Sequence, residues 1–202
     1  MRMQGRAARA VIVVGFVVAA AVGCTGIPGA PTAPTSPVSA TPTPSPTPTE
    51  PSPVPSPTSD VTTPPERPAA MSEATADGAA AAASYFMRLF PYIFATGDFA
   101  EWGALSDDGC QYCQNTRGSV EDQMARGMVG AGSEITVESA VGTEIVPGQS
   151  FSADLVVTQA PSFEVAADGR RTPDGDGGRY QLHVALTWSS EWRIVAVDAS
   201  RV

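Results

Sequence analysis

Proline distribution divides this chain of 202 residues more sharply than any other feature. Fifteen of its nineteen prolines lie between Pro28 and Pro68, in a tract otherwise rich in Thr and Ser. Proline fixes the backbone angle φ and has no amide hydrogen to donate, so such a tract forms neither a helix interior nor a central strand. We therefore expect residues 24–70 to be a disordered linker and residues 71–202 to be one folded domain.

The composition of the linker favours an extended spacer. Polyproline II rises about 3.1 Å per residue, so roughly forty residues can span ~100 Å. Two other interpretations stay open: O-glycosylation of the Thr and Ser hydroxyls, and recognition of a Pro-x-x-Pro motif by a partner. We prefer the spacer, because the known readers of such motifs are mostly intracellular domains.

The first 23 residues have the pattern of an export signal. Arg2, Arg6 and Arg9 precede an apolar run over residues 10–22. This run is shorter than the ~20 residues of a membrane-spanning helix, which favours a cleaved signal peptide. It ends in Ala-Val-Gly-Cys24, which resembles the bacterial lipobox, where the cysteine takes a diacylglycerol and the preceding peptide bond is cut.

Cys24 is therefore the expected lipidation site. Ala21 departs from the leucine that is usual three places before the cysteine. The alternative is an ordinary secretory signal with an incidental cysteine, but Cys24 stands at the junction and the linker holds no second cysteine to pair with it. Two acyl chains, palmitate among them, anchor a protein stably. We expect a lipoprotein on the extracytoplasmic face of the cell membrane.

The charge pattern excludes several partners. The formal net charge is −9 and the chain contains no lysine. Nine arginines follow the signal region, against twenty-one acidic residues. No basic cluster is present to neutralise phosphates, so we expect neither nucleic-acid binding nor polybasic attraction to anionic lipid.

The folded region begins with helical periodicity. Apolar side chains recur at three- and four-residue spacing over residues 79–94, which predicts an amphipathic helix. Ser72 is expected to cap it, and Pro91 to kink or interrupt it near its end. Gly97 suits the left-handed residue that follows a helix.

Two further helices are expected before the strands. Asp98 and Glu101 form a capping-box-like pair at the start of a short second helix. A third is expected to run from Cys110 to about residue 128. Three glycines should end it: Gly127, Gly130 and Gly132.

From residue 135 the apolar period changes to two, which predicts strands. Four are expected, over residues 135–145, 151–157, 180–188 and 192–196. Residues 168–178 form a polar, glycine-rich loop whose Asp174 and Asp176 resemble half of a calcium loop. It lacks the third ligand and the later glutamate, so we interpret it as a solvated hairpin and expect no metal.

Three helices followed by a four-stranded antiparallel meander make an α+β fold with the helices on one face of a curved sheet. That order, with the ending Trp192-Arg-Ile-Val, resembles the nuclear-transport-factor-2-like cone fold. The finer pattern resembles a family of uncharacterised actinobacterial lipoproteins, a domain of unknown function. The shared features are the lipobox, the Pro/Thr stalk, the aromatic-rich first helix, Thr96-Gly97-Asp98 and Cys110-x-x-Cys113. The resemblance covers residues 66–202. It implies a fold and a cellular location, but it implies no catalytic residues.

Cys110 and Cys113 are left as a pair once Cys24 is lipidated. In an oxidising compartment we expect them to form a disulfide that ties the second helix to the third. Thiol–disulfide exchange is the alternative. We favour the structural interpretation, because redox folds place this motif between a strand and a helix, whereas here a helix precedes it.

His183 is the only histidine. By strand alternation it faces away from the apolar series that meets the helices, and Asp154 is also expected to face outward. Enzymes of the cone fold often place a His–Asp pair in the pocket, so a catalytic role for His183 is disfavoured. Six aromatic residues are candidates for a ligand pocket at the open end of a cone, although such spacing is also typical of core: Tyr85, Phe86, Phe90, Trp102, Trp188 and Trp192.

No convergent set of nucleophile, base and metal ligands is visible. We therefore expect a binding module for a protein partner or a small apolar ligand, with no cofactor, rather than an enzyme. Two alternatives stay open: a thiol–disulfide oxidoreductase acting through Cys110 and Cys113, and an isomerase or hydrolase of the cone fold.

Overall fold

The computed structural model describes residues 60–202. The expected signal peptide (1–23), the lipidation site Cys24 and the linker up to residue 59 lie outside the described residues. The described chain contains helices and two antiparallel sheets. The helices are η1 (Ala69–Ser72, a 3-10 helix), α1 (Ala76–Thr96), α2 (Ala100–Leu105) and α3 (Gln111–Ala125). The strands are β1 (Met128–Gly132), β2 (Ile135–Val146), β3 (Ser150–Gln159), β4 (Ser162–Ala166), β5 (Arg171–Gly175), β6 (Gly178–Trp188) and β7 (Trp192–Arg201).

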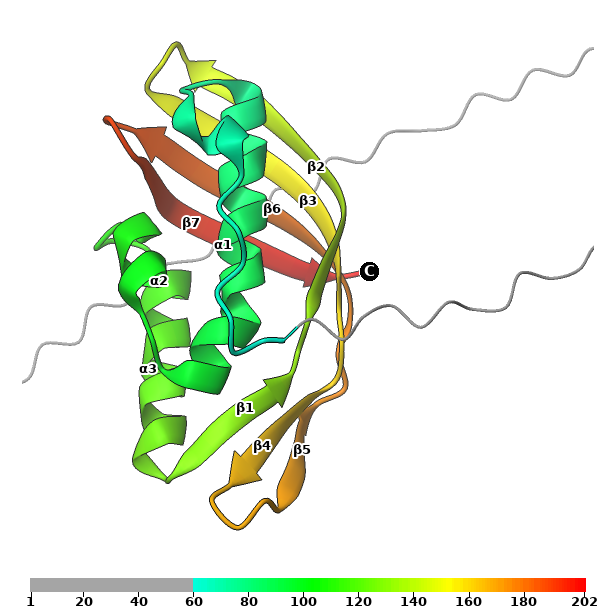
Figure 1. The fold of residues 1–202 in the computed structure, drawn as a ribbon. Coiled ribbons are helices and arrows are strands. Elements are labelled where there is room, and N and C mark those ends of the chain that lie inside the picture. The colour runs from blue at the N-terminus through cyan, green and yellow to red at the C-terminus, as the bar shows by residue number, and fades with distance from the viewer. Residues whose placement is uncertain (1–59) are drawn as a thin grey trace, which may run out of the picture. The chain divides into compact units, whose positions relative to one another are not determined.

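The larger sheet has the strand order β2-β3-β6-β7 and carries the core. Its strands alternate as expected: Phe151, Ala153, Leu155 and Val157 of β3 are buried, while Asp154 between them is exposed. Leu155 pairs with Leu182 of β6 in register. The helices cover this apolar face, and α1 lies along it (Figure 1). The mixed α+β architecture with helices packed on an antiparallel sheet is confirmed.

A second, smaller sheet has the order β1-β4-β5 and differs from our expectation. The third helix ends at Ala125 instead of about residue 128, and the glycine-rich segment after it forms β1. The loop predicted over residues 168–178 contains β5, which pairs with β4. In sequence β4 and β5 lie between β3 and β6, so the four predicted strands are not one continuous meander. These short strands show no alternation of burial, because pairing rather than core packing orders them.

The start of α1 also differs from the prediction. Its N-cap is Thr75, whose hydroxyl accepts a hydrogen bond from the Gly78 amide at 3.0 Å, whereas Ser72 is the last residue of η1. Gly78 explains the close turn: a Cβ there would lie 2.1 Å from the Glu73 carbonyl oxygen. The helix then continues through Pro91 to Thr96 without interruption.

The end of α1 is as expected, and the start of α2 is not. Gly97 has a left-handed φ of 71°, and its amide donates to the Ile93 carbonyl. Asp98 accepts from the Ala100 amide at 2.9 Å, but Glu101 instead accepts from the Tyr85 hydroxyl at 3.1 Å. The reciprocal capping box is therefore absent, because the Glu101 side chain is hydrogen-bonded to Tyr85 of α1 instead.

The end of the expected linker lies against the domain. Val61 and Pro65 border a cavity whose other walls include Pro91 and Tyr92 of α1, and Met71 is buried. Among residues 60–202, no helix is long and apolar enough to cross a membrane.

Candidate functional site

An apolar chamber of about 160 Å³ lies between the helix layer and the larger sheet. Helices α1 and α3 contribute one side and strands of the larger sheet the other. Its walls, which define the apolar chamber below, are Met87, Phe90, Tyr112, Ile135, Val157, Gln159, Tyr180, Leu182 and Ala199. Ala199 is itself exposed and therefore lies at the mouth of the chamber. A partly open cleft with mostly aliphatic and aromatic walls suits an apolar occupant.

Tyr112 is the polar group that α3 contributes to this chamber. Burial raises the pKa of Tyr112 to about 12, and the Thr116 side chain opposes that shift. The phenol is therefore neutral at physiological pH. Tyr112 therefore adds no charge to the walls of the chamber.

A second cavity of about 220 Å³ adjoins the first and shares Phe90 and Gln159 with it as walls. It lies where α1 and α3 meet the smaller sheet. Because its walls carry more polar groups, we refer to it as the polar chamber. Its other lining residues are Phe94, Gln123, Gly130, Ala131, Ser133, Ser162, Phe163, Asp174 and Gly175.

The six aromatic residues selected from the sequence do not surround one cavity. Tyr85, Phe86 and Trp102 lie in the core, with exposed fractions of 2%, 0% and 1%. Phe86 and Trp102 stack with ring centroids 4.0 Å apart. These three residues support the helix layer from within.

The other three aromatic residues lie at two separate places. Phe90 lines both chambers. Trp188 and Trp192 pack edge to face at 5.0 Å and border a different, open hollow beside η1. The Trp192 indole donates to the Met71 carbonyl at 3.0 Å, which holds η1 on the β6–β7 hairpin.

Sequence reasoning missed the polar residues of the second chamber, of which Gln123 is the clearest. One signal was available. Cys113, Thr116 and Val120 follow a helical stripe that turns inward, and Gln123 continues that stripe. A glutamine at a core-facing position indicates a buried polar contact.

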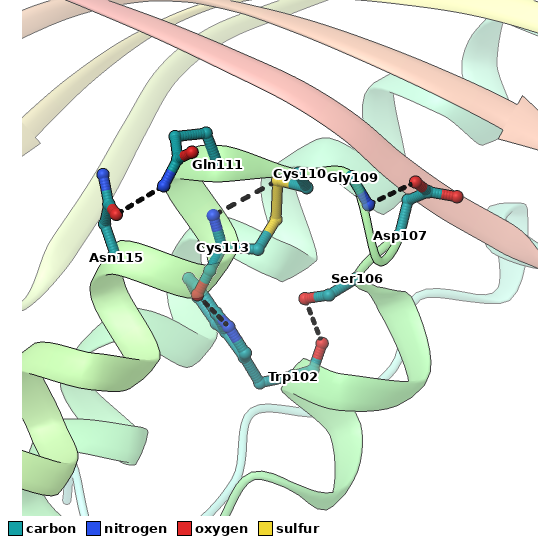
Figure 2. Close-up of a disulfide and its surroundings, with 8 residues drawn as sticks. All are labelled: Trp102, Ser106, Asp107, Gly109, Cys110, Gln111, Cys113 and Asn115. Carbon is teal, nitrogen blue, oxygen red and sulfur yellow. Dashed lines mark hydrogen bonds between the residues drawn. A yellow bond between two sulfur atoms is a disulfide. The ribbon is translucent and has the colours of Figure 1, made fainter. Parts of the chain in front are cut away.

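The expected disulfide between Cys110 and Cys113 is confirmed. Figure 2 shows it at the start of α3, beside the turn that leads from α2. Cys110 is the N-cap residue, and its sulfur accepts from the Cys113 amide at 3.2 Å. The Trp102 indole donates to the Cys113 carbonyl at 3.3 Å. Both cysteines are at most 1% exposed, whereas thiol exchange requires access to a sulfur, so this position suits a structural clip.

His183 and Asp154 lie on the outer face of the larger sheet, as strand alternation predicts. Their side chains are each 54% exposed, and His183 Nδ1 lies 2.8 Å from Asp154 Oδ1. The register also places Asp198 of β7 opposite His183. The pair points away from the core-facing side of the sheet, so it cannot act on a molecule held in either chamber.

Comparison with known proteins places this geometry in context. The sequence pattern described as "Family of unknown function (DUF6318)" matches residues 50–198. No protein of curated function matches the chain.

Several solved structures are similar at low sequence identity. The intermembrane space region of the chloroplast protein ARC6 is 12% identical, with 63% of this chain and 98% of that chain covered and a TM-score of 0.49. An uncharacterised Caulobacter vibrioides protein with a cystatin-like fold is 12% identical, with 62% and 90% covered and a TM-score of 0.41. Aln2 from a Streptomyces species is 12% identical, with 59% and 87% covered and a TM-score of 0.39.

Proposed function

This chain belongs to the family of unknown function DUF6318, and we propose that it is a non-enzymatic binding module that holds a small apolar ligand outside the cell membrane. In this proposal a lipid on Cys24 anchors the protein and the proline-rich linker holds the domain away from the membrane. The ligand occupies the apolar chamber.

The apolar chamber is the observation that carries this proposal. Apolar cavities of roughly 150 Å³ in proteins stay free of water and bind benzene or xenon, and this chamber measures about 160 Å³. Most of the surface that lines it is apolar, although Tyr112, Gln159 and Tyr180 are also among its walls. A ligand of benzene size gains contact with those walls and loses little hydrogen bonding to water.

The positions of the reactive groups support a binding module over the two enzymatic alternatives. His183 and Asp154 lie on the outer face of the larger sheet, away from the chamber. Cys110 and Cys113 are buried, with at most 1% of each residue exposed. Acid–base catalysis needs a group within hydrogen-bond reach of the substrate, and disulfide exchange needs an accessible sulfur.

Benzene titration of residues 60–202, followed by backbone amide NMR shifts, tests the ligand site. We expect the largest shifts at residues that line the apolar chamber. Ala199→Phe places a ring at the mouth of the chamber and should weaken benzene binding at least about tenfold. Ala196→Phe is the matched control, because Ala196 is exposed on the same strand and does not line the chamber. Shifts that are absent, or equal in both variants, would contradict the proposal.

The anchor has its own experiment. The full chain is expressed in a bacterial host with an alkyne-labelled fatty acid, as the natural protein and as Cys24→Ala. We expect the natural protein to carry the alkyne label and to associate with the membrane, and we expect Cys24→Ala to lose both. Thr32→Ala, in the same linker, should keep both. Labelling that survives in Cys24→Ala would contradict lipidation at this residue.

A further inference from the structure

We propose that the polar chamber is a second subsite for the same ligand, and that it takes a neutral head group which donates a hydrogen bond. This inference rests on the proposed function and deepens it. The ligand class is a small amphipathic molecule, with an apolar ring or short chain in the apolar chamber. Its hydroxyl or N–H group lies in the polar chamber.

Gln123 provides the first argument. It is only 3% exposed, and its side-chain amide nitrogen donates to the Phe94 carbonyl at 3.3 Å. Within residues 60–202, no hydrogen bond reaches its carbonyl oxygen, and no fully enclosed side-chain polar atom lacks a partner. The oxygen therefore keeps some accessible surface, and Gln123 is one of the walls of the polar chamber. Buried amide oxygens normally accept a hydrogen bond, so this oxygen is an acceptor for a ligand.

Ser133 provides the second argument. It is 4% exposed and lines the same chamber. Its φ of 57° is unusual for a residue other than glycine, and its amide donates to the Pro161 carbonyl at 3.1 Å. A left-handed serine costs free energy that glycine would not, and such residues occur often at binding sites. Its hydroxyl is a second neutral group at the chamber wall.

Aromatic rings form the apolar part of the polar chamber. Phe90 and Phe94 are half-buried, with ring centroids 4.7 Å apart. Gly130 of β1 faces them, and a Cβ at that position would lie 2.8 Å from the Phe94 Cβ. Gly130 therefore lets β1 pack closely against Phe94 of α1, and this contact fixes one wall of the chamber.

Asp174 is the charged residue among the walls of the polar chamber, and it favours a donor over an anion. Asp174 is exposed at its edge and accepts weakly from the Ser162 hydroxyl at 3.4 Å. Arg126, nearby at the end of α3, is paired with Glu164. A carboxylate or phosphate head group would meet the Asp174 charge, whereas an O–H or N–H group can donate to the acceptors present.

The two chambers adjoin each other. Phe90 and Gln159 form walls of both. In this proposal a phenyl group occupies the apolar chamber and a short alcohol chain passes these two side chains into the polar chamber. Phenethyl alcohol therefore fits the inferred class, and its methyl ether matches it in apolar character but lacks the donor.

Titration of the full chain with these two probes tests the subsite. We expect phenethyl alcohol to bind about three- to tenfold more tightly than its methyl ether, as one net hydrogen bond allows. Gln123→Met should remove that preference and leave benzene binding in place. Gln114→Met is the matched control, because Gln114 is exposed on the same helix. It should keep the preference.

Ser133→Gly is a second variant, which tests the subsite even if Gln123→Met folds poorly. Glycine adopts the positive φ without strain, so this variant should fold at least as well while it lacks the hydroxyl, and we expect the preference to fall. Equal binding of alcohol and ether by the natural protein, with benzene bound, overturns the subsite and leaves the proposed function standing. A preference that persists in both variants overturns it as well. Failure of benzene to bind overturns the proposed function itself.

Discussion

The two sheets of this domain are built on different principles. In the larger sheet, β3 buries four apolar side chains against the helices, and β6 buries three. In the smaller sheet no strand residue is fully buried, and every residue of β5 is exposed. Hydrophobic burial orders the first sheet, whereas backbone pairing and a few surface contacts order the second. The comparison indicates that stability resides in the larger sheet.

The two chambers follow the same division. The apolar chamber lies against the larger sheet, and its strand residues are mostly aliphatic. The polar chamber lies against the smaller sheet, where unburied strands leave space and polar groups beside Phe163. Low local stability is typical of binding regions, because such regions must open to admit a ligand. The smaller sheet is the region we expect to move.

The largest effect should come from truncating the core of the larger sheet. Leu155→Ala removes a side chain that is 1% exposed, and should lower the free energy of unfolding by about 2–5 kcal/mol. Val165→Ala in β4, which is half-buried, should cost less than about 1.5 kcal/mol. Urea unfolding followed by circular dichroism measures both. Equal losses would break the comparison between the sheets.

Removal of the disulfide should have the next largest effect. The double variant Cys110→Ala/Cys113→Ala should lose about 2–3 kcal/mol, because the closed loop is short but both cysteines are buried. Hydrogen exchange should quicken in α2 and α3, and β4 and β5 should change little. Asn115→Ala, which removes only an exposed contact to Gln111, is the control and should be near neutral. Faster exchange confined to β4 and β5 would contradict this assignment.

Alkaline pH should destabilise the helix layer. Burial, reinforced by Glu101, raises the pKa of Tyr85 to about 12 from its ordinary 10.0. The folded state therefore holds this proton to higher pH than the unfolded state does. The Tyr85 contribution is complete below pH 10 and is lost as the pH rises toward 12, by on the order of 1–2 kcal/mol.

The double variant Tyr85→Phe/Tyr112→Phe tests this pH dependence, because burial also raises the pKa of Tyr112. Urea unfolding at a series of pH values should show a shallower decline for the variant. None of the three strands of the smaller sheet contains tyrosine, so this titration acts on the rest of the domain. An unchanged slope would show that other groups cause the decline.

The smallest effect should come from the ion pair that ties the end of α3 to the smaller sheet. Arg126 pairs with Glu164 of β4, and its side chain is 58% exposed. Arg126→Ala should therefore lower the free energy of unfolding by less than about 1 kcal/mol, with a smaller difference at high salt. Hydrogen exchange in β4 should quicken. Arg117→Ala breaks the exposed pair with Glu121 within α3 and should leave β4 unchanged.

The parts of the fold that follow local rules were predictable. The alternation of β3 and β6, the left-handed Gly97 and the Cys110–Cys113 disulfide are confirmed. The resemblance to a family of unknown function agrees with the family match. The lipid anchor and the binding activity stay predictions.

The wrong predictions share a cause. Each depends on a partner that is distant in sequence or on a neighbour in the fold. Glu101 accepts a hydrogen bond from Tyr85 instead of capping the second helix. The N-cap of α1 is Thr75 rather than Ser72, and it lies beside the tightly packed Gly78. The segments of β1 and β5 contain glycine and proline and show no alternation, so only their pairing with β4 makes them strands.

The sequence by itself determined where the apolar faces lie, because apolar residues recur every second position in a strand and every third or fourth position in a helix. This spacing is visible in neighbouring residues of the chain. It also determined the acidic charge, the proline-rich linker and the pairing of the last two cysteines. Only the tertiary structure decided that Gln123, Ser133 and Gln159 meet around one cavity. These residues come from α3, a loop and β3, and their meeting depends on how the two sheets and the helix layer pack together.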